Sequence, residues 1–197
     1  MSGAPLPSSP PERPVAGAPG APPLWMPDEP FPPYRFVPGH APHPFAHRDG
    51  YAHGQRELAP PFVPPARWRE NRGWLRGVDF FNRGWWWEAH EVWEGLWHVA
   101  QGRDDAQRDF LKAAIQLAAA ALNRERGLDD GAERLLRSAC EGLERVRAAG
   151  AADTANIAGA ESEARFMGLS LVELIAAAQA ALGRPVARVD GFWLLPR

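Results

Sequence analysis

The chain has 197 residues, of which 45% are hydrophobic, and this is enough to bury one sizeable core in a single folded domain. Its formal net charge of -2 provides no overall basic field, which argues against nucleic acid and anionic membranes as partners. The single cysteine, Cys140, excludes an internal disulfide and a multi-cysteine zinc site, and we interpret it as a small core residue.

The sequence shows no targeting or membrane-spanning element. Its N-terminus lacks the apolar stretch after a basic start that marks a secretory signal. The apolar run QLAAAAL is bounded by Asn123 and Arg124, with Lys112 nearby, and is far shorter than the roughly 18 residues that indicate a membrane span. We therefore expect a soluble, cytoplasmic protein.

Proline divides the chain into two regions. Of the 21 prolines, 19 lie within the first 65 residues. Proline removes a backbone donor and biases the preceding residue away from helix, so residues 1–66 are predicted to form an extended or disordered arm. The later part of the arm is rich in aromatic residues and could lie across the surface of the helical domain predicted over residues 67–197.

Four of the six histidines lie in this arm: His40, His43, His47 and His53. A histidine-rich tract can bind metal, but proline or glycine separates these residues. No carboxylate or cysteine completes a recognisable ligand spacing among them. We therefore interpret the arm as a docking or linker segment.

After residue 67 the apolar residues recur every three or four positions, which predicts a series of helices. The first begins near Trp68 and is interrupted at Gly84. The segment GAADTANIAGAES is expected to link the last two helices. The C-terminal tail is expected to be extended, and its apolar residues Phe192 and Trp193 are expected to require a surface on which to pack. The remaining helices are expected over about 85–100, 105–126, 130–148 and 171–182.

Capping residues support these boundaries. Asp130 with Glu133, and Ser170 with Glu173, have the spacing of capping boxes that open the last two helices. Glycines follow the expected ends of the second, third and last helices. Since no alternating series is long enough for a sheet, the predicted fold is all-α, a compact bundle of about five helices built from helical hairpins.

The second predicted helix carries an unusual combination of residues. The window of residues 80–98 contains five tryptophans, two histidines and three glutamates. On a helical projection its apolar residues form one broad stripe, which we interpret as core, with Trp86 and Trp97 at the edge. His90 and Glu94 border that stripe, and Glu91 lies a little further round.

The third predicted helix is apolar or small almost all round, which is typical of burial. Lys112, the only lysine in the chain, shares one stripe with Gln116. Consecutive helices joined by a short loop tend to pack antiparallel. One hypothesis therefore places Lys112 and Gln116 opposite His90, Glu91 and Glu94 in a polar pocket. The alternative is that this stripe is ordinary solvent-facing surface.

His90 and Glu94 have the i, i+4 spacing that allows two side chains to hold one ion on a helix face. They are the candidate ligands of a single divalent metal, and the next helix offers no inward histidine or carboxylate for a second ion. As catalytic candidates, His90 and Glu94 would act as acid and base or hold the metal, and Glu91 would orient His90 or polarise water. Lys112 or Gln116 would stabilise negative charge. Structural ion pairs are the alternative.

Common catalytic motifs are missing from the sequence. It contains no glycine-rich phosphate loop, no G-x-S-x-G elbow, no paired CxxC and no HExxH. These absences argue against the common nucleotide-binding, serine-hydrolase and zincin classes.

Three motifs occur in order along the chain: FNRGWWWEAHEVWEGLW, FLKAAIQLAAAAL and RGLDDGAERLL. Together they resemble domain-of-unknown-function family 309 over about residues 77–146. The resemblance implies an all-helical fold and a predicted metal-dependent hydrolase. This chain departs from the family pattern at Trp93, where an aliphatic residue is usual, and at Asn123, where many members have histidine. The pattern falls on Phe81, Asn82, Gly84, Glu88, Ala89, His90, Glu91, Glu94, Trp97 and Gln116.

Two functions follow as hypotheses. The first is a metal-dependent hydrolase with a pocket formed by the candidate residues. The second is a non-catalytic interaction module, in which the hairpins present a groove to a peptide and the arm supplies contacts in cis or to a second subunit. The expected partner is a small ligand or a peptide, and the sequence is compatible with a homo-oligomer.

Overall fold

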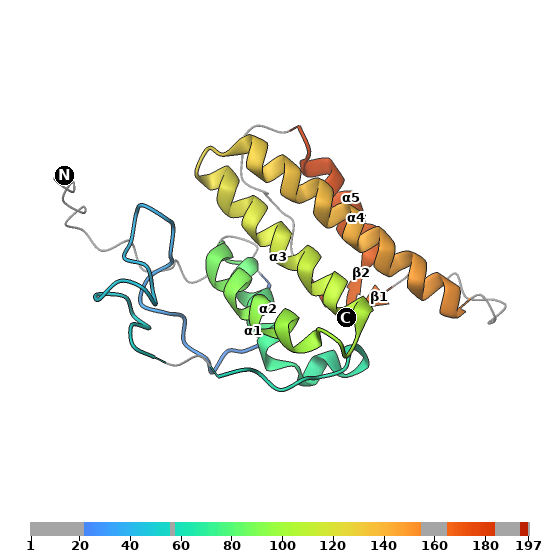
Figure 1. The fold of residues 1–197 in the computed structure, drawn as a ribbon, viewed down its shortest axis with the longest axis horizontal. Helices are drawn as coiled ribbons and strands as arrows, with labels where there is room; N and C mark the ends of the chain where they lie inside the picture. Colours follow the sequence, from blue (N-terminus) through green and yellow to red (C-terminus); the bar gives the residue numbers. More distant parts are fainter. Residues whose placement is uncertain (1–21, 56–57, 155–164, 184–193, 197) are drawn as a thin grey trace.

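The structure, a computed structural model, describes residues 22–55, 58–154, 165–183 and 194–196 (Figure 1). Most of the expected extended tail, including Phe192 and Trp193, and most of the expected linker before the last helix lie outside the described residues. None of the helices in the described part combines the length and hydropathy needed to cross a bilayer.

The described residues are mostly helical, which confirms the predicted all-α class. They form one 3-10 helix and five α-helices: η1 (Pro65–Glu70), α1 (Arg72–Phe81), α2 (Trp86–Ala100), α3 (Asp105–Glu125), α4 (Asp129–Thr154) and α5 (Leu171–Ala181). Two short antiparallel strands, β1 (Arg165–Phe166) and β2 (Leu169–Ser170), pair with Arg165 opposite Ser170. This hairpin was not expected, because two residues per strand leave no detectable alternation.

Several helix boundaries follow the capping signals, but Asp130, the predicted cap of the fourth helix, lies inside α4, which begins at Asp129. Gly102 and Gly127 both have φ of +70°, the left-handed conformation that favours glycine after a helix. Before α5, the Ser170 side chain accepts a hydrogen bond from the backbone N–H of Glu173 at 3.2 Å. The prediction was wrong for the end of α4, which continues beyond residue 148 to Thr154. Alanines flank Gly150, and their high helix propensity allows the helix to continue.

The helices pack in chain order. Helix α3 lies between α2 and α4, α1 packs on α2, and α5 packs on α4 (Figure 1). The core at the α1–α2–α3 junction is aromatic, because Trp74 stacks on Trp93 at 5.4 Å between ring centroids and Phe110 lies 5.3 Å from Trp74. The predicted apolar stripe of α2 is buried at Ala89, Trp93, Leu96 and Ala100, and the predicted core residue Cys140 is buried in α4.

The arm lies against the helical domain, as the sequence suggested. Its described residues up to the start of η1 form turns and irregular backbone. Buried carboxylates of the helices hold this backbone: Asp79 of α1 accepts hydrogen bonds from the N–H groups of Trp25 and Met26 at 2.9 and 2.8 Å. Arg35 of the arm donates to the carbonyl of Gly84 at 2.9 Å and pairs with Glu125 at the end of α3. These contacts tie the arm to α1, to the turn before α2 and to the end of α3.

Candidate functional site

His90, Glu91 and Glu94 form a cluster on α2. One ligand atom of each side chain lies within 4.8 Å of those of the other two. His90 and Glu91 expose 28% and 26% of their side chains, so the cluster is open to solvent. Within the described residues, it is the one group of three or more histidine, cysteine or acidic side chains with this proximity.

The imidazole of His90 contains a buried nitrogen that forms no hydrogen bond within the described part of the chain. Its Nδ1 is buried and has no hydrogen-bond partner among the described residues. Glu91 Oε1 lies 3.3 Å from this nitrogen, but not in hydrogen-bonding geometry. Because buried polar atoms are nearly always satisfied, an imidazole nitrogen without a hydrogen-bond partner beside two carboxylates is suited to coordinate a cation. One imidazole and two carboxylates form a donor set that zinc, manganese and iron accept.

The structure does not bring Lys112 and Gln116 to this cluster. Lys112 is exposed. Gln116 donates from Nε2 to the Ser138 Oγ of α4 at 2.8 Å. Since α3 lies between α2 and α4, this hydrogen bond turns the Gln116 amide away from α2. The hypothesis of a shared pocket is therefore wrong for these two residues, and the alternative of a solvent-facing strip holds for Lys112.

Glu88 is a buried acidic residue whose environment the sequence did not reveal. It is 3% exposed, and its Oε1 accepts a hydrogen bond from the backbone N–H of Phe36 at 2.7 Å. Burial raises the pKa of Glu88 to about 7, an effect that the Phe36 N–H, the charge of Arg35 and the Tyr51 hydroxyl partly offset. The burial of Glu88 depends on the course of the arm, which the sequence of α2 alone does not reveal.

A comparison with known families finds a match for the segment that contains α2 and α3. Residues 74–135 match the model of the family described as domain of unknown function (DUF309). The segment of residues 74–135 is a DUF309 domain. It begins within α1, contains α2 and α3, and ends in the first part of α4, so it includes the whole His90 cluster. No curated protein and no solved structure matches the chain significantly.

The arm that precedes the DUF309 segment uses its histidines to build turns. His43 Nδ1 accepts hydrogen bonds from the N–H groups of Phe45 and Ala46 at 3.3 and 3.2 Å, and His47 Nδ1 accepts from Asp49 at 3.1 Å. Local side-chain-to-backbone bonds of this kind stabilise irregular segments. These two histidines therefore stabilise the arm's own turns.

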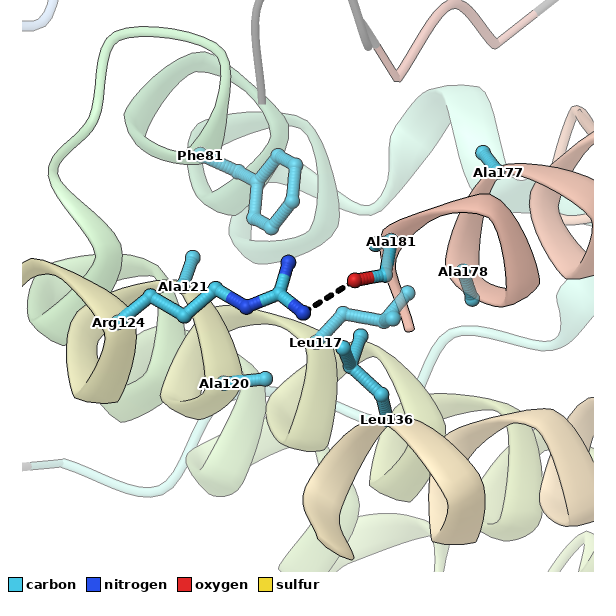
Figure 2. Close-up of a pocket in the computed structure, with 9 residues that line it drawn as sticks. All are labelled: Phe81, Leu117, Ala120, Ala121, Arg124, Leu136, Ala177, Ala178 and Ala181. Atoms are coloured by element: carbon cyan, nitrogen blue, oxygen red, sulfur yellow. Dashed lines mark hydrogen bonds between the residues drawn. The ribbon is translucent and has the colours of Figure 1, made fainter. Parts of the chain in front are cut away.

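A hollow lies between the end of α1 and helices α3, α4 and α5 (Figure 2). The lining is Phe81, Leu117, Ala120, Ala121, Arg124, Leu136, Ala177, Ala178 and Ala181. Figure 2 shows the guanidinium of Arg124 reaching across to the carbonyl of Ala181, with which it forms a hydrogen bond. The lining has no carboxylate, imidazole or thiol, so it offers no metal ligand and no general base.

Proposed function

We propose that the DUF309 segment binds one divalent metal ion through His90, Glu91 and Glu94 and that it is a metal-dependent hydrolase. One observation carries this proposal: three ligand atoms lie within 4.8 Å of one another, and the buried Nδ1 of His90 beside them has no hydrogen-bond partner. The family resemblance of the three sequence motifs supports the same chemistry. A cytoplasmic location is part of the proposal.

A divalent ion held by these side chains would supply Lewis-acid activation of water and polarise a carbonyl or phosphoryl oxygen of a substrate. His90 and Glu94, one helical turn apart, would hold the ion. Glu91 would add a third ligand, the second carboxylate of the set, or accept a proton from an attacking water. The partial exposure of His90 and Glu91 leaves the site accessible to a substrate from solvent.

Metal binding is tested with the full chain, purified without a histidine tag. Zinc, manganese or iron(II) should raise its melting temperature, because a ligand at 100 times its Kd stabilises a protein by about 2.7 kcal/mol. His90→Gln and Glu94→Gln should abolish the shift. His98→Gln is the matched control, because His98 is an exposed histidine on the same helix outside the cluster. Equal shifts in the control and the two variants would refute the site.

Hydrolysis is tested separately on the metal-loaded chain. Nitrophenyl phosphates and nitrophenyl carboxylic esters serve as probes, because they report phosphoryl and acyl transfer to water. Activity should disappear with a chelator, return with metal, and fall by at least about 100-fold in Glu91→Gln if this carboxylate acts as general base. A chain that binds metal stoichiometrically but hydrolyses no probe of either class would refute the hydrolase assignment and leave the metal site intact.

A non-catalytic interaction module is the second candidate function. One observation favours it: the surface of α1 and α2 binds a proline- and aromatic-rich segment, namely the chain's own arm, through Asp79 and Glu88. A peptide of similar composition in trans would use the same carboxylates. Two results together would favour this function. The melting temperature of the wild-type chain would not change on adding metal, and a synthetic peptide of residues 22–55 would bind to a variant that lacks the arm.

A further inference from the structure

One face of α1 holds the arm segment of residues 22–31 through charged side chains. This surface, the α1 face, consists of four residues at spacings of four, three and four positions along the helix and the turn after it: Arg72, Arg76, Asp79 and Arg83. The Asp79 carboxylate accepts the N–H groups of Trp25 and Met26. Arg83 donates to the carbonyl of Pro22 at 2.7 Å. Because these contacts are to backbone groups, a peptide of another sequence can also form them.

The α1 face also borders a contact site for one aromatic ring of the segment. Phe31 packs edge-on against Phe80 and Trp85, with 5.1 Å between ring centroids in both pairs. The guanidinium of Arg76 lies over the same ring, 4.7 Å from its centroid, and donates a hydrogen bond to the carbonyl of Pro30. These contacts favour an aromatic side chain directly after a proline.

The charges of the α1 face and of the segment are complementary. The face carries three arginines and one aspartate, a formal charge of +2, whereas residues 22–31 contain two acidic residues, Asp28 and Glu29, and no basic residue. Glu29 forms an ion pair with Arg72, and its Oε2 lies 3.6 Å from Nε of Arg76. The face is therefore suited to an acidic peptide that contains proline and an aromatic residue.

The arm does not satisfy the α1 face completely. Arg76 is 8% exposed, and its Nη1 is buried without a hydrogen-bond partner among the described residues. Burial lowers the pKa of the Arg76 guanidinium, and the charges of Glu29 and Asp79 partly offset this. An unpaired donor on a buried charged group weakens the contact that buries it. Because contacts between segments that separate are more polar than permanent ones, the docked segment is suited to exchange with another peptide.

We propose that the α1 face is a recognition site for an acidic, proline- and aromatic-containing peptide of a partner protein, and that the arm segment of residues 22–31 is its intramolecular competitor. This inference rests on the second candidate function, the interaction module, and names its binding face and the chemistry of its ligand. A tethered segment acts at a high effective concentration, so it occupies the face until a peptide with better contacts displaces it. An additional acceptor beside Nη1 of Arg76 would provide such a contact.

The test is a fluorescence anisotropy titration of a labelled synthetic peptide of residues 22–31 with the full-length chain. Phe31→Ala in the chain removes the ring that holds the competing segment, so this variant should bind the peptide at least about tenfold more tightly than the wild-type chain. Phe45→Ala is the matched control and should bind the peptide like wild type. Phe45 is an aromatic residue of the same arm, but its ring contacts Trp87 of α2.

Further variants test whether the peptide binds at the α1 face. A peptide that carries Phe31→Ala should bind the Phe31→Ala chain at least about tenfold more weakly than the unchanged peptide. Arg72→Glu, added to that chain, should weaken binding of the unchanged peptide at least about fivefold, because Arg72 is exposed and pairs with Glu29. Glu29→Gln in the chain loosens the same segment without removing a ring, and it replaces Phe31→Ala if the melting temperature shows that variant to be unfolded.

Three results would overturn the proposal, and none of them depends on the metal site. If the peptide binds neither Phe31→Ala nor Glu29→Gln, the α1 face accepts no peptide in trans. Binding of residues 22–55 to a variant without the arm would then leave the interaction module itself standing. If the peptide with Phe31→Ala binds as tightly as the unchanged peptide, binding does not use the aromatic contact site. If light scattering shows a wild-type dimer that Phe31→Ala dissociates, the arm of a second copy occupies the face.

Discussion

The buried carboxyl of Glu88 makes a quantitative prediction about stability and pH. Its pKa is raised from 4.5 to about 7 in the folded chain, mainly by burial. A raised carboxyl pKa means that the folded state holds the proton more tightly than the unfolded state. Stability from this group is therefore fully present below about pH 4.5 and is lost as pH rises to 7. Since one pKa unit corresponds to about 1.4 kcal/mol, the loss should be about 3 kcal/mol.

Glu88→Gln removes this dependence, because the amide keeps an oxygen to accept the Phe36 N–H and carries no charge. The free energy of unfolding should be measured by urea denaturation from pH 4.5 to 8.5, with a chelator present. The difference between variant and wild type should grow in favour of the variant by about 3 kcal/mol over this range. Other titrating groups, such as Asp79, are common to both chains and cancel in the difference.

Glu141→Gln, at an exposed position of α4, is the control and should show a small difference that does not change with pH. A difference for Glu88→Gln that stays constant between pH 4.5 and 8.5 would refute the reasoning. It would mean that Glu88 ionises at its ordinary pKa, and hence that water or a cation reaches it in solution.

Other substitutions test the packing of the arm and core. Gly77→Ala should destabilise the chain by about 3 kcal/mol or more, because its Cβ would lie 2.0 Å from Trp93 Nε1. Gly95→Ala, whose Cβ would make only an ordinary contact with Pro60, should be neutral or stabilise the chain by up to about 1 kcal/mol. Equal changes in the free energy of unfolding for Gly77→Ala and Gly95→Ala, measured by urea denaturation, would contradict the α1–α2 packing. Asp79→Asn leaves the N–H group of either Trp25 or Met26 without its acceptor, so a protease should cut the arm faster than in wild type. An unchanged rate of cleavage would argue against Asp79 as an anchor of the arm.

Much of the fold was predictable because it depends on local signals. The apolar stripe of α2 and the glycines after α2 and α3 are readable from a single helix at a time. The proximity of His90, Glu91 and Glu94 was predictable for the same reason, since they lie on one helix and their spacing alone brings them together.

Relations between elements were harder to predict. Helix α3 is covered on two sides, so its sequence does not say which neighbour satisfies the Gln116 amide, and Ser138 of α4 does so. The course of an irregular arm depends on where its N–H groups find acceptors in the folded domain. Asp79 and Glu88 gave no sequence signal that they would be those acceptors.

The central claim is a metal site at His90, Glu91 and Glu94, and elemental analysis of the tag-free, full-length chain tests it most directly. The chain, purified without added metal and compared with His90→Gln prepared in parallel, should contain about one divalent ion per molecule, and the variant should contain far less. Metal well below stoichiometric in wild type, with no thermal shift on adding zinc, manganese or iron(II), would contradict the account.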